Sequence, residues 1–259
     1  MRRIAAPELE DFAWFPSSLR DAMTGFLTVA AGALDVPGAI APLILEAMDA
    51  GGVDRVVDLC SGGGGPAVDV VRLLRARHGR DASVVLTDLY PNVDAFARAE
   101  AELPGHATGR REPVDATAVP AGLTGVRTIF NAFHHLGPAV ASAVLADAAA
   151  QRQPIVTFEL VERGWQGAFI AGTTPIAIAG LMPFVRPRRL ANLALTYAFP
   201  VLAAAIAWDG FASCLRAYSV DELEAMIAPL QRADYRFRVV RQRMPWRPVF
   251  MTCLVGVPT

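Results

Sequence analysis

The most informative segment of this chain is Val56-Val57-Asp58-Leu59-Cys60-Ser61-Gly62-Gly63-Gly64-Gly65-Pro66. Its apolar start predicts a buried strand over residues 53–59. Pro66 predicts the first turn of a helix that continues to residue 78, because the N–H that proline lacks would be unpaired in that turn anyway. Glycines between a strand and a helix let the backbone approach a ligand, and the start of the helix offers N–H groups. The pattern therefore predicts a nucleotide-like ligand at this turn.

Short apolar runs alternate with helical patterns through most of the following chain, as in a parallel sheet covered by helices on both faces. Ser219-Val220-Asp221-Glu222 has the form of a capping box and predicts a helix that ends near residue 230. We expect an α/β fold whose further strands cover residues 83–88, 126–131, 154–159, 235–242 and 249–255, with helices over residues 91–102 and 138–150.

Composition narrows the classes of function open to these 259 residues, a length that fits one catalytic domain with an elaboration. Hydrophobic residues make up 53% and charged residues 19%, which excludes disorder and leaves a globular or membrane-associated protein. The formal net charge of -1 gives no overall attraction to nucleic acid, so we expect no nucleic-acid partner. Every basic side chain is Arg, which excludes P-loop, protein-kinase and Schiff-base chemistry in their usual forms.

The cysteines indicate the cellular compartment. Cys60, Cys214 and Cys253 are an odd number without C-x-x-C spacing, so they predict neither a disulfide framework nor a zinc site, and we expect no metal. The first residues become acidic at Glu8 without an apolar run like that of a signal peptide. We therefore expect a cytoplasmic protein.

Two uncharged stretches, residues 164–185 and 190–208, flank Arg186-Pro187-Arg188-Arg189. Each is long enough to cross a membrane, but spanning would place the arginines on the far side, against the positive-inside tendency. Three alternatives stay open: a buried helical lid over an apolar pocket, a hairpin that enters one leaflet at the inner face of the membrane, and a true span. The predicted domains are an N-terminal helical cap (1–50), a catalytic domain (51–162 and 217–259) and an apolar helical insertion (163–216).

The turn after residue 57 resembles the first motif of the class I S-adenosylmethionine-dependent methyltransferases, which runs acid-x-Gly-x-Gly-x-Gly after the first strand. Asp58, Gly62 and Gly64 match this motif, and Cys60 stands in place of its first glycine. The resemblance covers residues 50–160 and 217–257. It implies a Rossmann-like, doubly wound, mostly parallel seven-stranded sheet with an antiparallel last strand. The helical segments at the N-terminus and after strand 5 occupy the places where this family builds its substrate cover.

The resemblance also implies S-adenosylmethionine as cofactor and assigns residues to it. Asp58 would order the loop and its cationic ligand, and the loop would approach the methionine portion. Asp88, which ends the second strand and precedes Leu89, would bind both ribose hydroxyls, since carboxylate oxygens accept two hydroxyl hydrogen bonds. The candidate cofactor-binding residues are Asp58, Cys60, Gly62, Gly63, Gly64, Asp88, Leu89, Asp115 and Ala116 near the adenine, and Asn131 after the fourth strand.

Methyl transfer from a sulfonium mainly needs an aligned acceptor and the exclusion of water, so few catalytic side chains are required. A hydroxyl acceptor would benefit from a base, for which His135 and His134 are the first candidates and Glu159 and Asp209 the next. A thiolate or a neutral amine would need none. For each of the four, an ordinary structural role is the competing interpretation.

The favoured hypothesis is methyl transfer to a hydrophobic small molecule or lipid-like acceptor, with peripheral membrane contact as a further expectation. An NAD(P)-dependent oxidoreductase is one alternative, disfavoured because the chain has no lysine for a Tyr-x-x-x-Lys proton relay. The Gly62-x-Gly64-x-x-Ala67 spacing also fits the loose dinucleotide fingerprint, and an oxidoreductase would want an acid at Asp88 as well. A non-enzymatic, membrane-interacting, cofactor-binding protein is the other alternative. The sequence does not determine the oligomeric state.

Overall fold

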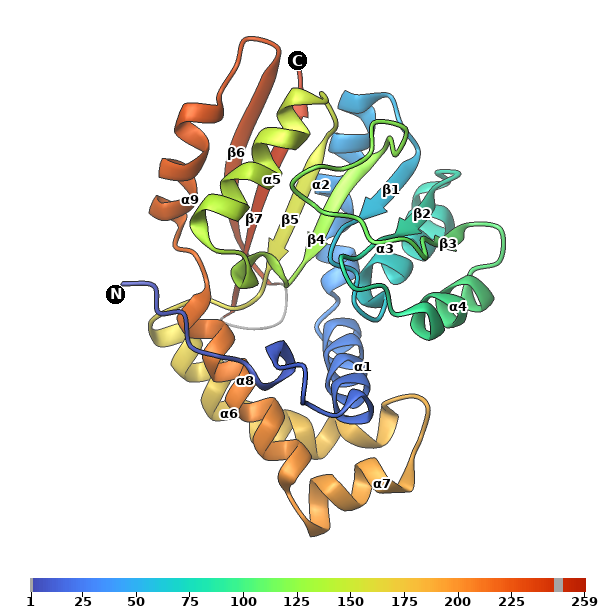
Figure 1. Cartoon of the computed structure of the whole chain (residues 1–259), viewed down its shortest axis with the longest axis vertical. Helices are drawn as coiled ribbons and strands as arrows, with labels where there is room; N and C mark the ends of the chain where they lie inside the picture. Colours follow the sequence, from blue (N-terminus) through green and yellow to red (C-terminus); the bar gives the residue numbers. More distant parts are fainter. Residues whose placement is uncertain (1, 245–248) are drawn as a thin grey trace. The chain divides into compact units, whose positions relative to one another are not determined.

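The computed structural model describes residues 2–244 and 249–259, and the chain divides into two compact units (Figure 1). The sheet unit comprises Asp35–Leu160 and Val220–Thr259, and the helical unit comprises Met1–Leu34 and Val161–Ser219. The predicted cap over residues 1–50 is therefore divided at Leu34. Residues 36–51 form a helix that packs against the sheet, because its buried side chains, such as Ile40 and Ile44, belong to the core there.

The sheet unit contains a seven-stranded sheet in the order β3-β2-β1-β4-β5-β7-β6. Strands β1 to β5 are parallel where they pair, and β7 is antiparallel to both β5 and β6, which confirms the predicted fold class. The strands are β1 (Arg55–Asp58), β2 (Ser83–Leu86), β3 (Ala107–Gly109), β4 (Val126–Phe130), β5 (Ile155–Glu159), β6 (Tyr235–Arg243) and β7 (Phe250–Pro258).

Helices cover both faces of this sheet, which explains why β4 and β5 are apolar along most of their length. α2 packs with α3 on one face, and α5 packs with α9 on the other (Figure 1). Most predicted boundaries are correct to within two residues. The helices are α2 (Val36–Gly51), α3 (Gly65–His78), α4 (Val93–Glu102), α5 (Pro138–Ala150) and α9 (Val220–Ile227), with short 3-10 turns η2 (Phe133–His135) and η5 (Ala228–Leu230).

The helical unit has a core of its own. Phe26 from its first helix, Ile178 and Met182 from the next segment, and Leu202 and Ile206 from the last helix are buried in one cluster. Its elements are η1 (Leu9–Asp11), α1 (Ser17–Ala33), α6 (Trp165–Leu181), η3 (Met182–Phe184), α7 (Leu190–Leu193), the π-helical turn η4 (Ala194–Ala198) and α8 (Val201–Arg216).

The predicted uncharged stretches form α6 with η3, and α7 to the start of α8. The segment Trp165–Phe184 is long and apolar enough to cross a membrane, and three spans result if each bent helix pair is counted as one. Only 17% of its most apolar 18-residue window is buried. Within the described residues most of this window is therefore exposed, and the lid, the leaflet hairpin and the span stay predictions.

Candidate functional site

Asp58 ends β1 in the middle of the sheet and is buried, with 3% of its surface exposed. The hydroxyl of Thr128 on the adjacent β4 donates to its Oδ1 at 2.7 Å. Burial raises the pKa of this carboxyl to about 7, and the nearby Asp88 carboxylate adds to the rise, while hydrogen bonds from Thr128 and Ser61 oppose it. A cationic group bound next to this buried carboxyl would stabilise its ionised form.

The turn after Asp58 requires left-handed backbone at three positions, with φ of 58° at Cys60, 51° at Gly62 and 81° at Gly64. Cys60 therefore adopts a backbone that favours glycine, the residue of the methyltransferase motif at this position. At Gly64, a Cβ atom would lie 3.0 Å from the side chain of Leu86, so the close packing favours glycine there too. At Gly62 a Cβ would meet nothing within 4 Å, so the backbone there borders open space for a ligand.

The carboxylate of Asp88 is hydrogen-bonded to this turn. Its Oδ2 accepts a hydrogen bond from the amide of Gly62 at 2.9 Å, and its Oδ1 accepts one from the amide of Tyr90, also at 2.9 Å. Each carboxylate oxygen has a second lone pair, so the group can still accept two hydroxyl hydrogen bonds. Leu89, the next predicted contact residue, is exposed beside it.

Asp115 reaches the same place through the backbone, since the amide of Val114 donates to the carbonyl oxygen of Asp88 at 2.8 Å. The hydroxyl and amide of Thr117 both donate to its carboxylate, which lowers the pKa of Asp115. The thiol of Cys60 has its pKa raised to about 12, first by burial and then by the carboxylates of Asp88, Asp58 and Asp115. The structure therefore brings Asp58, Asp88 and Asp115 together around the turn. Ala116 follows Asp115 in the chain.

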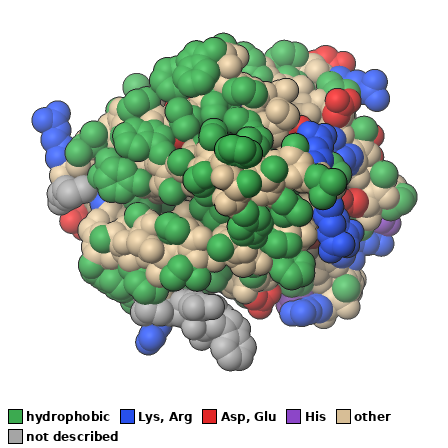
Figure 2. Space-filling view, turned by 90° about the horizontal axis from the view of Figure 1, so that it is seen from below, with side chains coloured by type: hydrophobic (Ala, Val, Ile, Leu, Met, Phe, Trp, Pro, Cys, Tyr) green, Lys and Arg blue, Asp and Glu red, His purple; other side chains and the backbone are tan. Residues whose placement is uncertain are grey.

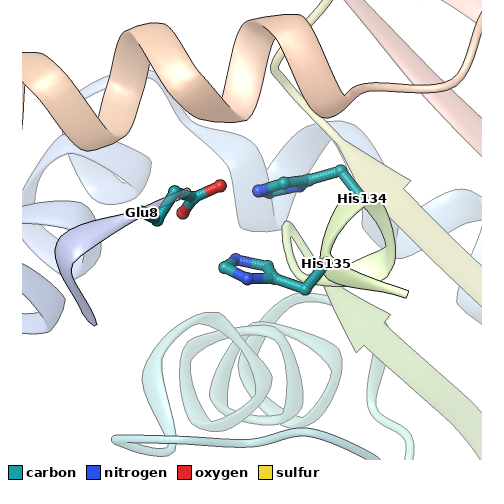
Figure 3. A group of neighbouring side chains, drawn as sticks. All are labelled: Glu8, His134 and His135. Atoms are coloured by element: carbon teal, nitrogen blue, oxygen red, sulfur yellow. The ribbon is translucent and has the colours of Figure 1, made fainter. Parts of the chain in front are cut away.

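His134 and Glu159, which sequence reasoning treats separately, form a pair at the carboxyl ends of the neighbouring strands β4 and β5. Glu159 Oε1 accepts from the backbone amide of His134 at 3.0 Å, and Oε2 lies 2.8 Å from its ring Nδ1. Both residues are buried. The ring of His135 lies beside that of His134, with centroids 4.4 Å apart, and both side chains come from η2 (Figure 3).

Asn131 connects β4 to this pair. It has a left-handed backbone (φ 50°), its amide donates to Phe158 O at 2.7 Å, and its side-chain oxygen accepts from the amide of Leu160 at 3.1 Å. These contacts hold the chain after β4 against the end of β5. Asn131 therefore shapes the segment that presents His134, and direct contact with a cofactor stays a prediction.

Asp209 lies in α8 of the helical unit, where its carboxylate supports the N-terminal segment. Its oxygens accept from the amides of Leu9 at 2.7 Å and Glu10 at 3.2 Å, and burial raises its pKa. Oxygens of Glu8, Glu10 and Asp209 lie within 4.8 Å of one another, but Arg216 already pairs with Glu8 at 3.3 Å. These amide contacts hold Asp209 against η1, and its role as a catalytic base stays a prediction.

The acceptor groups around the turn fit a nucleoside with a cationic tail. Asp88 offers acceptors for a diol, Asp58 offers a buried carboxylate for a cation, and open space borders Gly62. Sequence reasoning missed Thr128, the partner of Asp58. Thr128 lies in β4, opposite Asp58 in the register of β1 and β4, and a hydroxyl residue inside a buried strand is the signal that could have pointed to it.

The raised pKa of Asp58 predicts that stability falls as the pH rises. The folded protein keeps a proton on this carboxyl up to about pH 7, whereas the unfolded chain releases it near 3.8. Each pH unit between these values corresponds to about 1.4 kcal/mol. We expect Asp58→Asn to raise the free energy of unfolding by about 2–4 kcal/mol at pH 8 and by much less at pH 4. Urea unfolding of both proteins at the two pH values measures this, and parallel pH profiles would contradict it.

No protein-family model and no curated protein matches the sequence. Among solved structures, the plantazolicin methyltransferase BpumL in complex with SAH aligns over 94% of this chain and 98% of its own, with a TM-score of 0.53 and 8% identity. Magnesium protoporphyrin IX methyltransferase (ChlM) of Synechocystis PCC 6803 with bound SAH aligns over 90% of this chain and 86% of its own, with a TM-score of 0.48 and 13% identity. LepI in complex with SAM aligns over 79% of this chain and 43% of its own, with a TM-score of 0.44 and 16% identity. This chain therefore spans less than half the length of LepI.

The similarity to BpumL extends over almost the whole of both chains. The seven-stranded, mostly parallel sheet with its last strand, β7, antiparallel to both neighbours is the architecture that the resemblance of the turn implies. The chain therefore has the fold of the class I S-adenosylmethionine-dependent methyltransferases.

Proposed function

We propose that this protein is an S-adenosylmethionine-dependent methyltransferase that acts on a hydroxyl group of a hydrophobic small molecule or lipid-like acceptor. The observation that carries the proposal is the Asp58 turn, whose Gly62 amide is hydrogen-bonded to Asp88 and beside which Asp115 lies. The fold alone would suit other nucleotide ligands. The three acids on one glycine turn favour a ligand with a diol, an amino group and a positive charge.

Each part of the turn has a role in binding. Asp58 and the loop from Cys60 to Gly64 would hold the methionyl end, Asp88 the ribose hydroxyls, and Asp115 with Ala116 the adenine edge. When bound, S-adenosylmethionine supplies an electrophilic methyl group. The remaining work of the chain is to exclude water and to prepare the acceptor oxygen.

The pair of His134 and Glu159 favours a hydroxyl acceptor over a thiolate or an amine. Because Nδ1 faces the Glu159 carboxylate, it carries the hydrogen, and the neutral ring then has its lone pair on Nε2. Nε2 would accept the hydroxyl proton as the acceptor oxygen attacks, and Glu159 would stabilise the resulting imidazolium. His134 is thus the proposed base and Glu159 its positioning residue, with His135 packed against the ring.

The hydrophobic character of the acceptor is supported by the helical unit, whose helices expose aromatic side chains such as Trp165 and Phe199. The three cysteines are free, consistent with the proposed cytoplasmic location. Contact with the inner face of the membrane belongs to the same proposal, because lipid-like acceptors are found there.

Transfer of labelled methyl from S-adenosylmethionine to a lipid extract, compared with a polar metabolite extract, tests this function. We expect label in lipid products that are stable to base, as methyl ethers are. Label confined to the polar fraction would contradict the acceptor class. Calorimetric binding of NADH in place of S-adenosylmethionine would contradict the whole assignment and favour an oxidoreductase.

Asp88→Ala tests the cofactor site. Loss of two charge-assisted hydroxyl contacts is expected to weaken S-adenosylmethionine binding by about 2–4 kcal/mol, or roughly 30- to 1,000-fold in Kd. Asp94→Ala, which removes an exposed acid from the first turn of α4, is the matched control and should leave Kd unchanged. Equal affinities for Asp88→Ala and the control, measured by calorimetry, would refute the ribose role.

A further inference from the structure

The helical unit exposes many large hydrophobic side chains. Ile176 in α6 is 75% exposed, Leu190 at the start of α7 is 84% exposed, and Phe199 between η4 and α8 is 68% exposed. Large exposed apolar patches mark interaction sites on soluble proteins. We define the apolar surface as Trp165, Phe169, Ile176, Phe184, Leu190, Tyr197, Phe199, Val201, Trp208 and Phe211.

These side chains belong to helices that pack together. α6 contacts α8 directly, and the Tyr197 hydroxyl donates to the carbonyl oxygen of Ala179 at 2.6 Å, which ties η4 to α6. Other faces of α6 and α8 supply the buried core through Ile178 and Leu202. Helices that are apolar on both faces need an apolar environment on each. In Figure 2, hydrophobic side chains cover much of the face in view, and the basic side chains lie toward its edges.

Positive charge adjoins the apolar surface. Arg186, Arg188 and Arg189 lie between Phe184 and Leu190 in the chain and are exposed. Among the residues that the structure describes, none of the three has an acidic side chain within 4.0 Å. Arginines beside exposed aromatic and aliphatic side chains are typical of proteins that lie at the surface of an anionic bilayer.

A second copy of the chain is a poorer occupant of this surface. A symmetric dimer would bury this patch against its own copy and bring two sets of three arginines into one interface. The sequence from residue 164 to residue 208 contains no Asp or Glu that could neutralise them. Anionic lipid headgroups provide the missing negative charge, and acyl chains match the aromatic and aliphatic side chains.

A transmembrane arrangement fits less well than a superficial one. The pair formed by Leu190–Ala198 and Val201–Arg216 is bent by 77°, so it is not one straight span. α6 also contributes Ile178 to a core that it shares with α1, whose Arg20 and Asp21 are partly exposed. Charged side chains on a neighbouring helix suit the interface between water and lipid rather than the hydrocarbon layer.

We propose that the helical unit docks on anionic phospholipid bilayers, inserting the apolar surface into the headgroup region while Arg186, Arg188 and Arg189 bind lipid phosphates. This inference rests on the proposed function, because docking would hold the enzyme where lipid-like acceptors are found. The contact is peripheral and reversible by salt, since part of it is electrostatic.

Flotation of the full chain with vesicles tests the proposal. We expect binding to vesicles of phosphatidylcholine mixed with phosphatidylglycerol, and much weaker binding to phosphatidylcholine alone. Replacing Arg186, Arg188 and Arg189 with Gln should weaken binding to the mixed vesicles roughly 100-fold, as expected for three basic side chains near an anionic surface. Ile176→Ser, Leu190→Ser and Phe199→Ser combined should reduce binding to both vesicle types.

The matched control replaces Arg77, Arg98 and Arg236 with Gln, which makes the same change in net charge at exposed positions of the sheet unit. The control should bind vesicles like the unmodified protein. Three results would each overturn the proposal. The first is an equal loss of binding in the control and test variants, and the second is binding that resists high salt and protects α6 from protease. The third is a dimer, detected by light scattering, that only the serine variant dissociates. Calorimetry with S-adenosylmethionine separates the two claims: intact cofactor binding without flotation refutes docking alone, and flotation without cofactor binding refutes the proposed function.

Discussion

His134→Ala is expected to lower the kcat of methyl transfer to a hydroxyl acceptor by roughly 10²- to 10⁴-fold, the usual contribution of a positioned general base. The reason is the pairing of its Nδ1 with Glu159 at 2.8 Å, which fixes the ring and its tautomer. Binding of S-adenosylmethionine should change little, because the cofactor contacts are assigned to the turn after β1. Calorimetry and labelled transfer to the lipid extract measure the two quantities on the same protein.

Two further variants separate catalysis from folding. Glu159→Gln keeps an oxygen that can accept from the His134 amide but removes the charge that would stabilise the imidazolium, so kcat should fall while KM and the fold are retained. His135→Ala, at the neighbouring position of η2, should have the smaller effect on kcat. The base would be His135 instead if that variant lost more activity than His134→Ala. No loss in any of the three would indicate an acceptor that needs no base.

Asp147→Ala is expected to destabilise the protein by about 3–5 kcal/mol, because it leaves the fully buried guanidinium of Arg127 without its partner. Arg127 Nη1 lies 2.6 Å from Asp147 Oδ2, and burial already lowers the pKa of Arg127. The same carboxylate accepts hydrogen bonds from the side chain of Gln151 and the amide of Val119. Urea unfolding followed by circular dichroism gives the change in the free energy of unfolding.

The matched comparison replaces both charged partners. Arg127→Met together with Asp147→Leu removes the charge and its need for a partner at once, so it should cost far less than Asp147→Ala alone. Arg127→Met by itself should also be milder, since Asp147 is partly exposed and retains the contact with Gln151. A double variant as unstable as Asp147→Ala would show that packing, rather than the unpaired charge, sets the cost.

The sequence predicted most of the sheet unit correctly because its signals are local. Apolar runs marked β1, β2, β4, β5 and β7, and Pro66 marked the start of α3. The strand β3, Ala107–Gly109, gave no signal, since it has three residues of which only Ala107 is buried. The place of α2 was also missed, because an apolar helix face does not specify the element against which it packs.

The glycine turn with its acids was determined by the sequence alone. Left-handed backbone after a buried strand favours glycine, and a carboxylate at the strand end suits a cation or a diol because charge-assisted hydrogen bonds are strong. The meeting of Asp58 with Thr128, of His134 with Glu159, and of Asp209 with the amides of η1 was decided only by the tertiary structure. These partners are 25 to 200 residues apart. A side chain's hydrogen-bond partner depends on strand order and register, which no local pattern encodes.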